Sequence, residues 1–253
     1  MKVNYHTHTW RCNHAEPDER TYVERAIEGG FEVLGFSEHA PYVWESGFKS
    51  WFRMHPSQMD DYVDTILSLK KEYQDDIEIK LGMEVEYYPA CYERLMEFLK
   101  DYPIEYRILG QHYIGSEEGE PYMGATFVKG KYLERYVEQV IEAMQTEDFL
   151  YLAHPDLPAY IGFNATYRKH MKKLCLAAKE CHIPLEINLQ GILLGKHYPR
   201  EFFWKIAGEV GNEVLFGSDA HQPDAVVPEE SIRKAEDIVK KYDLQLVDRS
   251  IWR

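Results

Sequence analysis

The chain has 253 residues, 45% of them hydrophobic, and carries 29 basic against 43 acidic side chains, a formal net charge of −14. The apolar content suffices for a sizeable core and argues against disorder, while the acidic excess repels phosphate backbones and argues against a nucleic-acid-binding protein. No secretory leader, membrane-spanning stretch or paired-cysteine motif is visible, so we expect a cytoplasmic, reduced protein without a membrane partner.

Strand-like and helix-like segments alternate along the whole chain. A short strand-like run ends at His6 and His8, and further strands are expected at residues 32–37, 77–84, 106–112, 149–154, 184–188 and 213–221. Apolar side chains at helical spacing predict helices at residues 17–29, 62–73, 90–99, 132–144, 171–181, 202–207 and 232–242, followed by an apolar tail at 244–247. Seven such repeats without a linker predict a parallel sheet, closed into a barrel, in a single domain of residues 1–253.

Two longer segments interrupt this alternation. Residues 41–56 mix aromatic and polar side chains, which is typical of a loop that folds over a site, and residues 115–124 form a loop rich in Gly and Glu. The strands of parallel barrels carry functional residues at their C-terminal ends. We therefore looked for reactive side chains at those ends.

Metal-binding residue types follow one expected strand after another. His6 and His8 point the same way, because side chains two apart on a strand share a face, and neutral imidazole is a common zinc ligand. Each histidine alone is more simply a surface or core residue. Together, however, the strand ends and the first loop present seven histidines and two carboxylates: His6, His8, His14, His39, Glu84, His112, His154, Asp219 and His221.

Nine candidate ligands suit two or three divalent metals, since one catalytic zinc takes about three protein ligands. Grouped cations lower the pKa of water and stabilise charge on phosphoryl oxygens, so the set fits phosphate monoester hydrolysis. Histidine–carboxylate sets accept zinc, our first choice, and also iron or manganese. Cys12 could supply a thiolate nucleophile, but the histidines beside it are better explained as metal ligands.

The motifs resemble those of the PHP (polymerase and histidinol phosphatase) superfamily, most closely its stand-alone histidinol-phosphatase-like branch. The likeness extends from Val3 to His221 and rests on His6-Thr-His8-Thr, His14, Ser37-Glu-His39, Gly82-Met-Glu84-Val-Glu86, His112, His154-Pro-Asp156 and Gly217-Ser-Asp219-Ala-His221. The resemblance implies a distorted seven-stranded (β/α) TIM-like barrel. It also implies three ligand groups: His6, His8, Glu84 and Asp219; Glu84, His112 and His154; and His14, His39 and His221.

The resemblance further implies hydrolysis of L-histidinol phosphate to L-histidinol and phosphate, a step of histidine biosynthesis. A metal-bridging hydroxide would attack phosphorus, Asp219 would hold a metal and accept or relay the proton, and an arginine would bind the phosphate. The candidate arginines are Arg168, Arg53 and Arg107, each of which is alternatively an ordinary ion-pairing residue.

Two departures from the family pattern concern the substrate. Gly110-Gln-His112 stands where the family usually has Ser-x-His, and Leu189–Leu194 follows Glu186-Ile-Asn188 where a small and a basic residue are usual. Other phosphate monoesters, phosphotyrosine and nucleotide phosphates therefore stay open as substrates. The remaining alternatives are a binuclear amidohydrolase, which has no use for a third ligand group, and a non-catalytic metal-binding module.

Overall fold

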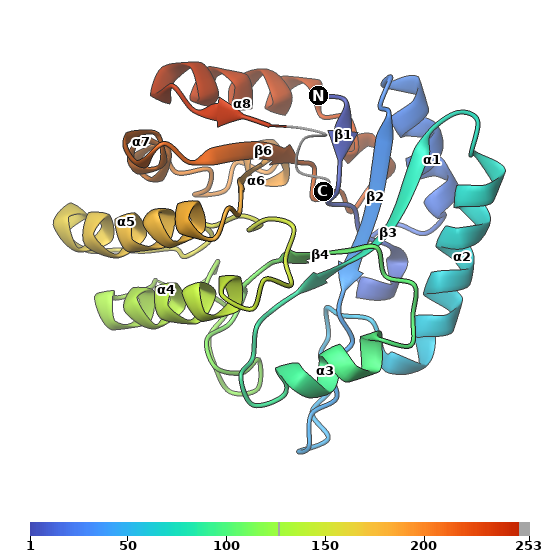
Figure 1. Cartoon of the computed structure of the whole chain (residues 1–253), viewed down its shortest axis with the longest axis horizontal. Helices are drawn as coiled ribbons and strands as arrows, with labels where there is room; N and C mark the ends of the chain where they lie inside the picture. The colour runs from blue at the N-terminus through green and yellow to red at the C-terminus, as the bar shows by residue number, and fades with distance from the viewer. Residues whose placement is uncertain (126, 248–253) are drawn as a thin grey trace.

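The computed structural model describes residues 1–125 and 127–247 as parallel strands with helices packed outside them (Figure 1). Four strands form one sheet, in the order β1 (Val3–Asn4), β2 (Val33–His39), β3 (Glu78–Val85) and β4 (Tyr106–Leu109). Three strands form a second sheet, in the order β5 (Leu185–Asn188), β6 (Glu213–Gly217) and β7 (Gln245–Leu246). All strand pairs are parallel, as the alternating sequence predicts.

Single-residue bridges connect the two sheets. Leu152 pairs with Leu109 of β4 and with Leu185 of β5, and Thr7 pairs with Ala220 beyond β6. The predicted strand at 149–154 is thus reduced to one bridging residue, which together with its chain neighbours shares backbone hydrogen bonds with β4 and β5. The α/β fold with a curled parallel sheet is confirmed, whereas the described residues form two sheets and no continuous seven-stranded one.

Helices cover the outside of both sheets. Figure 1 shows α1 (Glu19–Glu28), α2 (Met59–Glu72) and α3 (Tyr92–Leu99) beside the first sheet. On the other side of the view lie α4 (Gly130–Met144), α5 (Asn164–Glu180), α7 (Glu201–Val210) and α8 (Glu229–Tyr242). These helices match the predicted ones, while the short α6 (Leu189–Leu193) and strand β7 were not anticipated. Among the described residues no helix has the length and apolar character needed to cross a membrane.

Short 3-10 turns complete the structure: η1 (Trp10–Cys12), η2 (Pro56–Gln58) and η3 (Pro223–Ala225). Inside the curled sheet, Tyr106 fills the space between strands. Its hydroxyl donates to the backbone carbonyls of Tyr5, at 2.8 Å, and Phe36, at 3.1 Å. A Cβ on Gly35 or Gly82 would lie 2.2 or 2.3 Å from the Tyr106 side chain, so both positions require glycine.

Tyr106 makes one part of the strand interior aromatic, whereas the C-terminal ends of the strands are polar. All seven residues of β2 are buried, and the strand ends in Ser37, Glu38 and His39. Buried polar groups need partners. The C-terminal strand ends therefore form a polar centre within an otherwise apolar core.

Candidate metal centre

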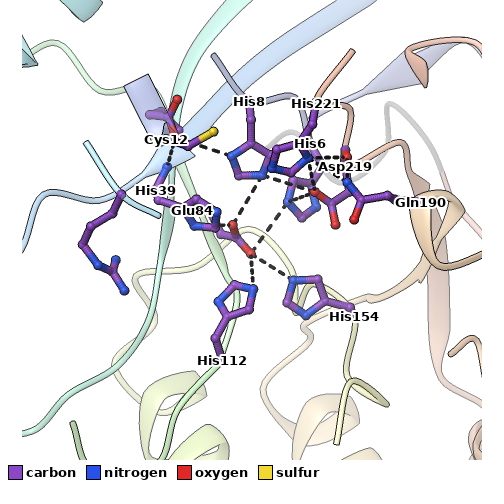
Figure 2. Close-up of polar contacts among 12 residues, drawn as sticks. His6, His8, Cys12, His39, Glu84, His112, His154, Gln190, Asp219 and His221 are labelled. Carbon is purple, nitrogen blue, oxygen red and sulfur yellow. Dashed lines mark hydrogen bonds and ion pairs between the residues drawn. The ribbon is translucent and has the colours of Figure 1, made fainter. Parts of the chain in front are cut away.

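The predicted ligands converge around two carboxylates. The carboxylate of Glu84, near the end of β3, lies within 4 Å of imidazole nitrogens from five histidines, as Figure 2 shows. The nitrogen–oxygen distances are 2.9 Å for His39, 3.0 Å for His154, 3.5 Å for His8, 3.7 Å for His6 and 3.8 Å for His112. Five rings from four strand ends, two of them from the end of β1, thus face one buried carboxylate.

Asp219, just beyond β6, faces the same space. Its Oδ1 lies 3.3 Å from Nε2 of His8, 3.6 Å from Nε2 of His6 and 3.4 Å from Nδ1 of His221. Asn188 donates to its Oδ2 at 3.0 Å, which orients the carboxylate. Asp219 and Glu84 therefore both face Nε2 of His6 and Nε2 of His8.

His14 joins two of these histidines, His39 and His221, in a further group. The ring nitrogens of His14, His39 and His221 lie within 4.8 Å of one another. His14 and His221 stack with ring centroids 4.4 Å apart, and His14 is the exposed member. The buried thiol of Cys12 likewise lies within 4.8 Å of a ring nitrogen of His8 and of His221. All nine predicted ligands are thus brought into one cluster.

Many polar atoms of the cluster have no partner with hydrogen-bond geometry within the described part of the chain; Nδ1 of His39 and Oε2 of Glu84, although 2.9 Å apart, are among them. The cluster atoms without such a partner are Nε2 of His6, both nitrogens of His8, Nδ1 of His39, Oε2 of Glu84, Nδ1 of His154 and Nε2 of His221. An orphaned buried polar atom costs about 1–3 kcal/mol, so this many in one place needs a compensating partner. Imidazole nitrogens and carboxylate oxygens that face a shared space are suitable ligands for divalent cations such as zinc.

The charge balance of the centre points the same way. Burial lowers the pKa of His39 to about 4 against the opposing effect of Glu84, which favours the neutral ring with a free lone pair. Burial alone would raise the pKa of Glu84, but His39, His112 and His6 hold it well below its usual value. For His6, burial is outweighed by Glu186, Asp219 and Glu84, which raise its pKa well above normal. The carboxylates therefore favour positive charge at His6, whereas burial favours the neutral form of His39, His14 and His221.

Buried carboxylates outside the cluster orient two of its rings. Glu186 of β5 lies 2.7 Å from Nδ1 of His6, and Glu86 lies 2.8 Å from Nδ1 of His112. Each carboxylate accepts a hydrogen bond from the Nδ1–H group of the ring. This leaves Nε2 directed at Glu84, an arrangement common around ligating histidines. Sequence reasoning did not assign these roles, because Glu186 and Glu86 alternate with apolar residues on strands and resemble ordinary strand positions.

Backbone conformation also directs two of the ligands. His154 has a φ of 29° and Asp219 a φ of 51°, in the left-handed region that residues other than glycine rarely adopt. Both residues stand where the chain leaves the sheet. Such strain persists only where surrounding contacts enforce it, and it often marks functional positions.

Seven of the nine clustered residues form the floor of a cavity of about 400 Å³, and only His6 and His8 do not line it. The aromatic loop predicted at residues 41–56 supplies Trp51 and Phe52 to its wall. The opposite wall comes from α6 and the loop after it. The lining consists of His14, His39, Trp51, Phe52, Glu84, His112, Tyr113, Tyr122, His154, Gln190, Leu193, Leu194, Lys196, Tyr198, Asp219, His221, Gln222 and Ala225. A small molecule with one polar end and one apolar end matches this cavity.

Arg53, a predicted phosphate ligand, is instead buried beside the cavity. Its guanidinium donates to both oxygens of Glu86, at 2.8 and 3.0 Å, to Glu117 at 2.8 Å and to the Ala40 carbonyl at 3.1 Å. Arg53 is 3% exposed and does not line the cavity. Its donors are used to bind the carboxylate that holds His112.

The other two predicted arginines lie outside the cavity as well. Arg107 pairs with Asp148 at 3.5 Å, and the exposed Arg168 pairs with Glu209. Both arginines therefore behave as ordinary ion-pairing residues, the alternative to phosphate binding. Among the described residues the cavity wall contains no arginine, so the prediction of an arginine at the phosphate gains no support from any of the three.

Comparison with known proteins agrees with this geometry. The model of the PHP domain family matches residues 4–190. The chain belongs to the PHP domain family. A probable histidinol-phosphatase of Deinococcus radiodurans is 26% identical over 87% of this chain and 86% of its own length. The histidinol-phosphatase of Bacillus subtilis is 26% identical over 88% and 94%.

A solved structure also shares the fold. The histidinol phosphate phosphatase of Lactococcus lactis, crystallised with zinc, L-histidinol and phosphate, superposes with a TM-score of 0.75 at 22% identity, over 97% of this chain and 95% of that one. The family resemblance expected from the motifs is therefore confirmed.

Proposed function

We propose that this chain is a metal-dependent phosphatase that hydrolyses L-histidinol phosphate to L-histidinol and phosphate, a step of histidine biosynthesis. The observation that carries the proposal is the convergence of six histidines on Glu84 and Asp219, with His14 beside His39 and His221, at one cavity. Membership of the PHP family and the named activity of its curated relatives support the substrate.

We assign the ligands to three groups. His6, His8, Glu84 and Asp219 would hold one cation, Glu84 with His112 and His154 a second, and His14, His39 and His221 a third, with zinc as the expected metal. The orphaned nitrogens and the distances to Glu84 support two or three ions. When bound, such cations lower the pKa of water and neutralise charge on phosphoryl oxygens. The bridges at Leu152 and Thr7 support a distorted seven-stranded barrel, in one domain, as the scaffold.

Asp219 is the proposed catalytic residue. Its Oδ1 faces the histidine rings while Asn188 fixes its Oδ2, so the carboxylate is held in one orientation beside the cavity. We assign to it the proton of the attacking water. The water oxygen forms a bond to phosphorus, the bond from phosphorus to the alcohol oxygen breaks, and that oxygen takes up a proton. Burial would raise the pKa of Asp219, but His6, His8 and His221 keep it well below normal, so the group starts ionised.

The cavity walls suit the alcohol part of a small ester. Trp51, Phe52, Tyr113 and Tyr122 offer flat apolar surface above the polar floor, and aromatic faces bind both planar rings and cations. Histidinol has an imidazole ring and an ammonium group. The grouping of His14 with His39 and His221 argues against a binuclear amidohydrolase, which leaves that trio without a role.

The test is a substrate panel assayed on protein whose metal content is measured. It contains histidinol phosphate, p-nitrophenyl phosphate, phosphotyrosine, a nucleotide monophosphate, and simple amides and lactones. We expect the highest kcat/KM with histidinol phosphate and no amide or lactone hydrolysis. A higher kcat/KM with another phosphate ester would change the assigned substrate but leave the assignment as a phosphatase intact. Full metal occupancy without any phosphatase activity would overturn the proposal in favour of a non-catalytic module.

A further inference from the structure

One side chain on the cavity wall combines positive charge with freedom from other partners. Lys196 is the only lysine or arginine among the described residues that line the cavity. Its ammonium group forms no ion pair or hydrogen bond with any other described residue. By contrast, Arg53, Arg107 and Arg168 all pair with carboxylates. The positive charge expected of an arginine at the phosphate is therefore available at Lys196.

The loop that carries Lys196 is fixed to the metal centre at its beginning. Asn188 caps α6 by accepting from the Gly191 amide at 2.8 Å, and its amide group donates to Asp219. Gln190 donates to the Asp219 carbonyl at 2.7 Å. The start of the loop is thus tied directly to the proposed catalytic residue.

A tight turn then directs the chain back to the cavity. Gly195 adopts a φ of 60°, which ends α6 in the left-handed conformation that glycine tolerates best. The amide of Lys196 donates to the Gly191 carbonyl at 2.8 Å and closes this turn. The backbone of Lys196 is therefore held by main-chain hydrogen bonds, and only its side chain is free to move.

The end of the loop is fixed on the other side of the centre. His197 contacts the Leu157 carbonyl through Nε2 at 2.6 Å, and the Arg200 amide donates to the buried Asp156. Leu157 and Asp156 follow His154, one of the proposed ligands. The segment from Asn188 to Arg200 therefore spans the cavity between Asp219 and His154, with Lys196 part-way along.

We propose that Lys196 binds the non-bridging phosphoryl oxygens of the substrate and of the product phosphate. The inference rests on the proposed function and adds to it the side chain that recognises the anion. A lysine binds phosphate as a compact point charge on a flexible stem, which suits an exposed side chain that closes on the ligand. Lys196 is in this sense a substrate-binding residue, and the walls of the cavity select the alcohol.

The experiment compares wild-type protein with Lys196→Met, Lys196→Arg and the control Lys205→Met, which removes an exposed lysine of α7 away from the cavity. Inorganic phosphate binding is measured by calorimetry on metal-loaded protein, and kcat and KM are measured for two esters, with and without a carboxylate on the alcohol. Metal content is measured for every variant. Calorimetry needs no turnover, so this test remains decisive even if no substrate is found.

We expect Lys196→Met to weaken phosphate binding about 10-fold or more, to raise KM for both esters alike, and to leave metal content unchanged. Lys196→Arg should retain most of the binding, and Lys205→Met should match wild type. Unchanged phosphate affinity in Lys196→Met would overturn the proposal. So would an effect confined to the carboxylated ester, because Lys196 would then bind the alcohol part instead. Failure of the wild type on all esters would refute the proposed function separately.

Discussion

Replacing Arg53 with Met distinguishes a structural from a substrate-binding role for this residue. In the structure Arg53 joins three segments: loop 41–56, which carries it; loop 115–124, which carries Glu117; and the end of β3, followed by Glu86. All three side chains are at most 5% exposed. The substitution would leave two buried carboxylates without their cation.

Breaking a buried ion pair by removing one partner costs about 3–5 kcal/mol. For a chain of this size, each 1 kcal/mol shifts the melting temperature by about 2–4 °C. We therefore expect Arg53→Met to melt about 6–20 °C below wild type. Because Glu86 accepts from His112, we also expect weaker metal retention against a chelator.

The assay is thermal unfolding monitored by circular dichroism, together with KM and metal content at a temperature where both proteins are folded. Arg168→Met serves as the control, since its exposed pair with Glu209 should change the melting temperature little. An unchanged melting temperature combined with a raised KM would refute the reasoning. Arg53 would then contact the phosphate, as its sequence position first indicated.

Three further predictions concern the metal centre. Asp219→Asn should fold and retain part of its metal but lose nearly all turnover with any phosphate ester; near-normal kcat would remove Asp219 from the mechanism. Glu186→Gln, which removes the charge that orients His6, should lower metal affinity or kcat/KM about 10- to 100-fold, measured by chelator competition; unchanged affinity and activity would mean that the contact is not needed. For Glu86, burial would raise the pKa, but Arg53 and His112 lower it from 4.5 to about 2. Its stabilisation is therefore present above about pH 4.5 and lost as the pH falls toward 2, so the melting temperature should fall over that window, and less steeply in Arg53→Met.

Periodicity along the chain predicted most of the scaffold. Strands and helices were placed correctly wherever an apolar pattern spans several turns or a full buried strand, as in β2 and α4. Leu152 shows where this reasoning stops. Its segment has the composition of a strand, but pairing depends on the distance to β4 and β5, and that distance is a property of the curled sheet.

The clustering of the predicted ligands was foreseeable from sequence for a physical reason. Parallel strands bring their C-terminal ends to one edge, so a histidine or carboxylate at each end necessarily contributes to one place, as His6, Glu84 and Asp219 do. The supporting carboxylates were not predictable, because a buried Glu on a strand has no local pattern that names the histidine it orients. Glu186 contacts a ring 180 positions away in the chain.

The amino-acid sequence by itself determined the parallel α/β order and the nine side chains that cluster at the strand ends, since both follow from residue type and spacing along the chain, and its motifs carried the resemblance to the family. Only the tertiary structure decided which positively charged side chains line the cavity. Whether Arg53 or Lys196 faces a substrate depends on which carboxylates lie nearby in space. Folding buries Arg53 between Glu86 and Glu117 and leaves Lys196 on the cavity wall, an outcome that charge alone along the chain does not specify.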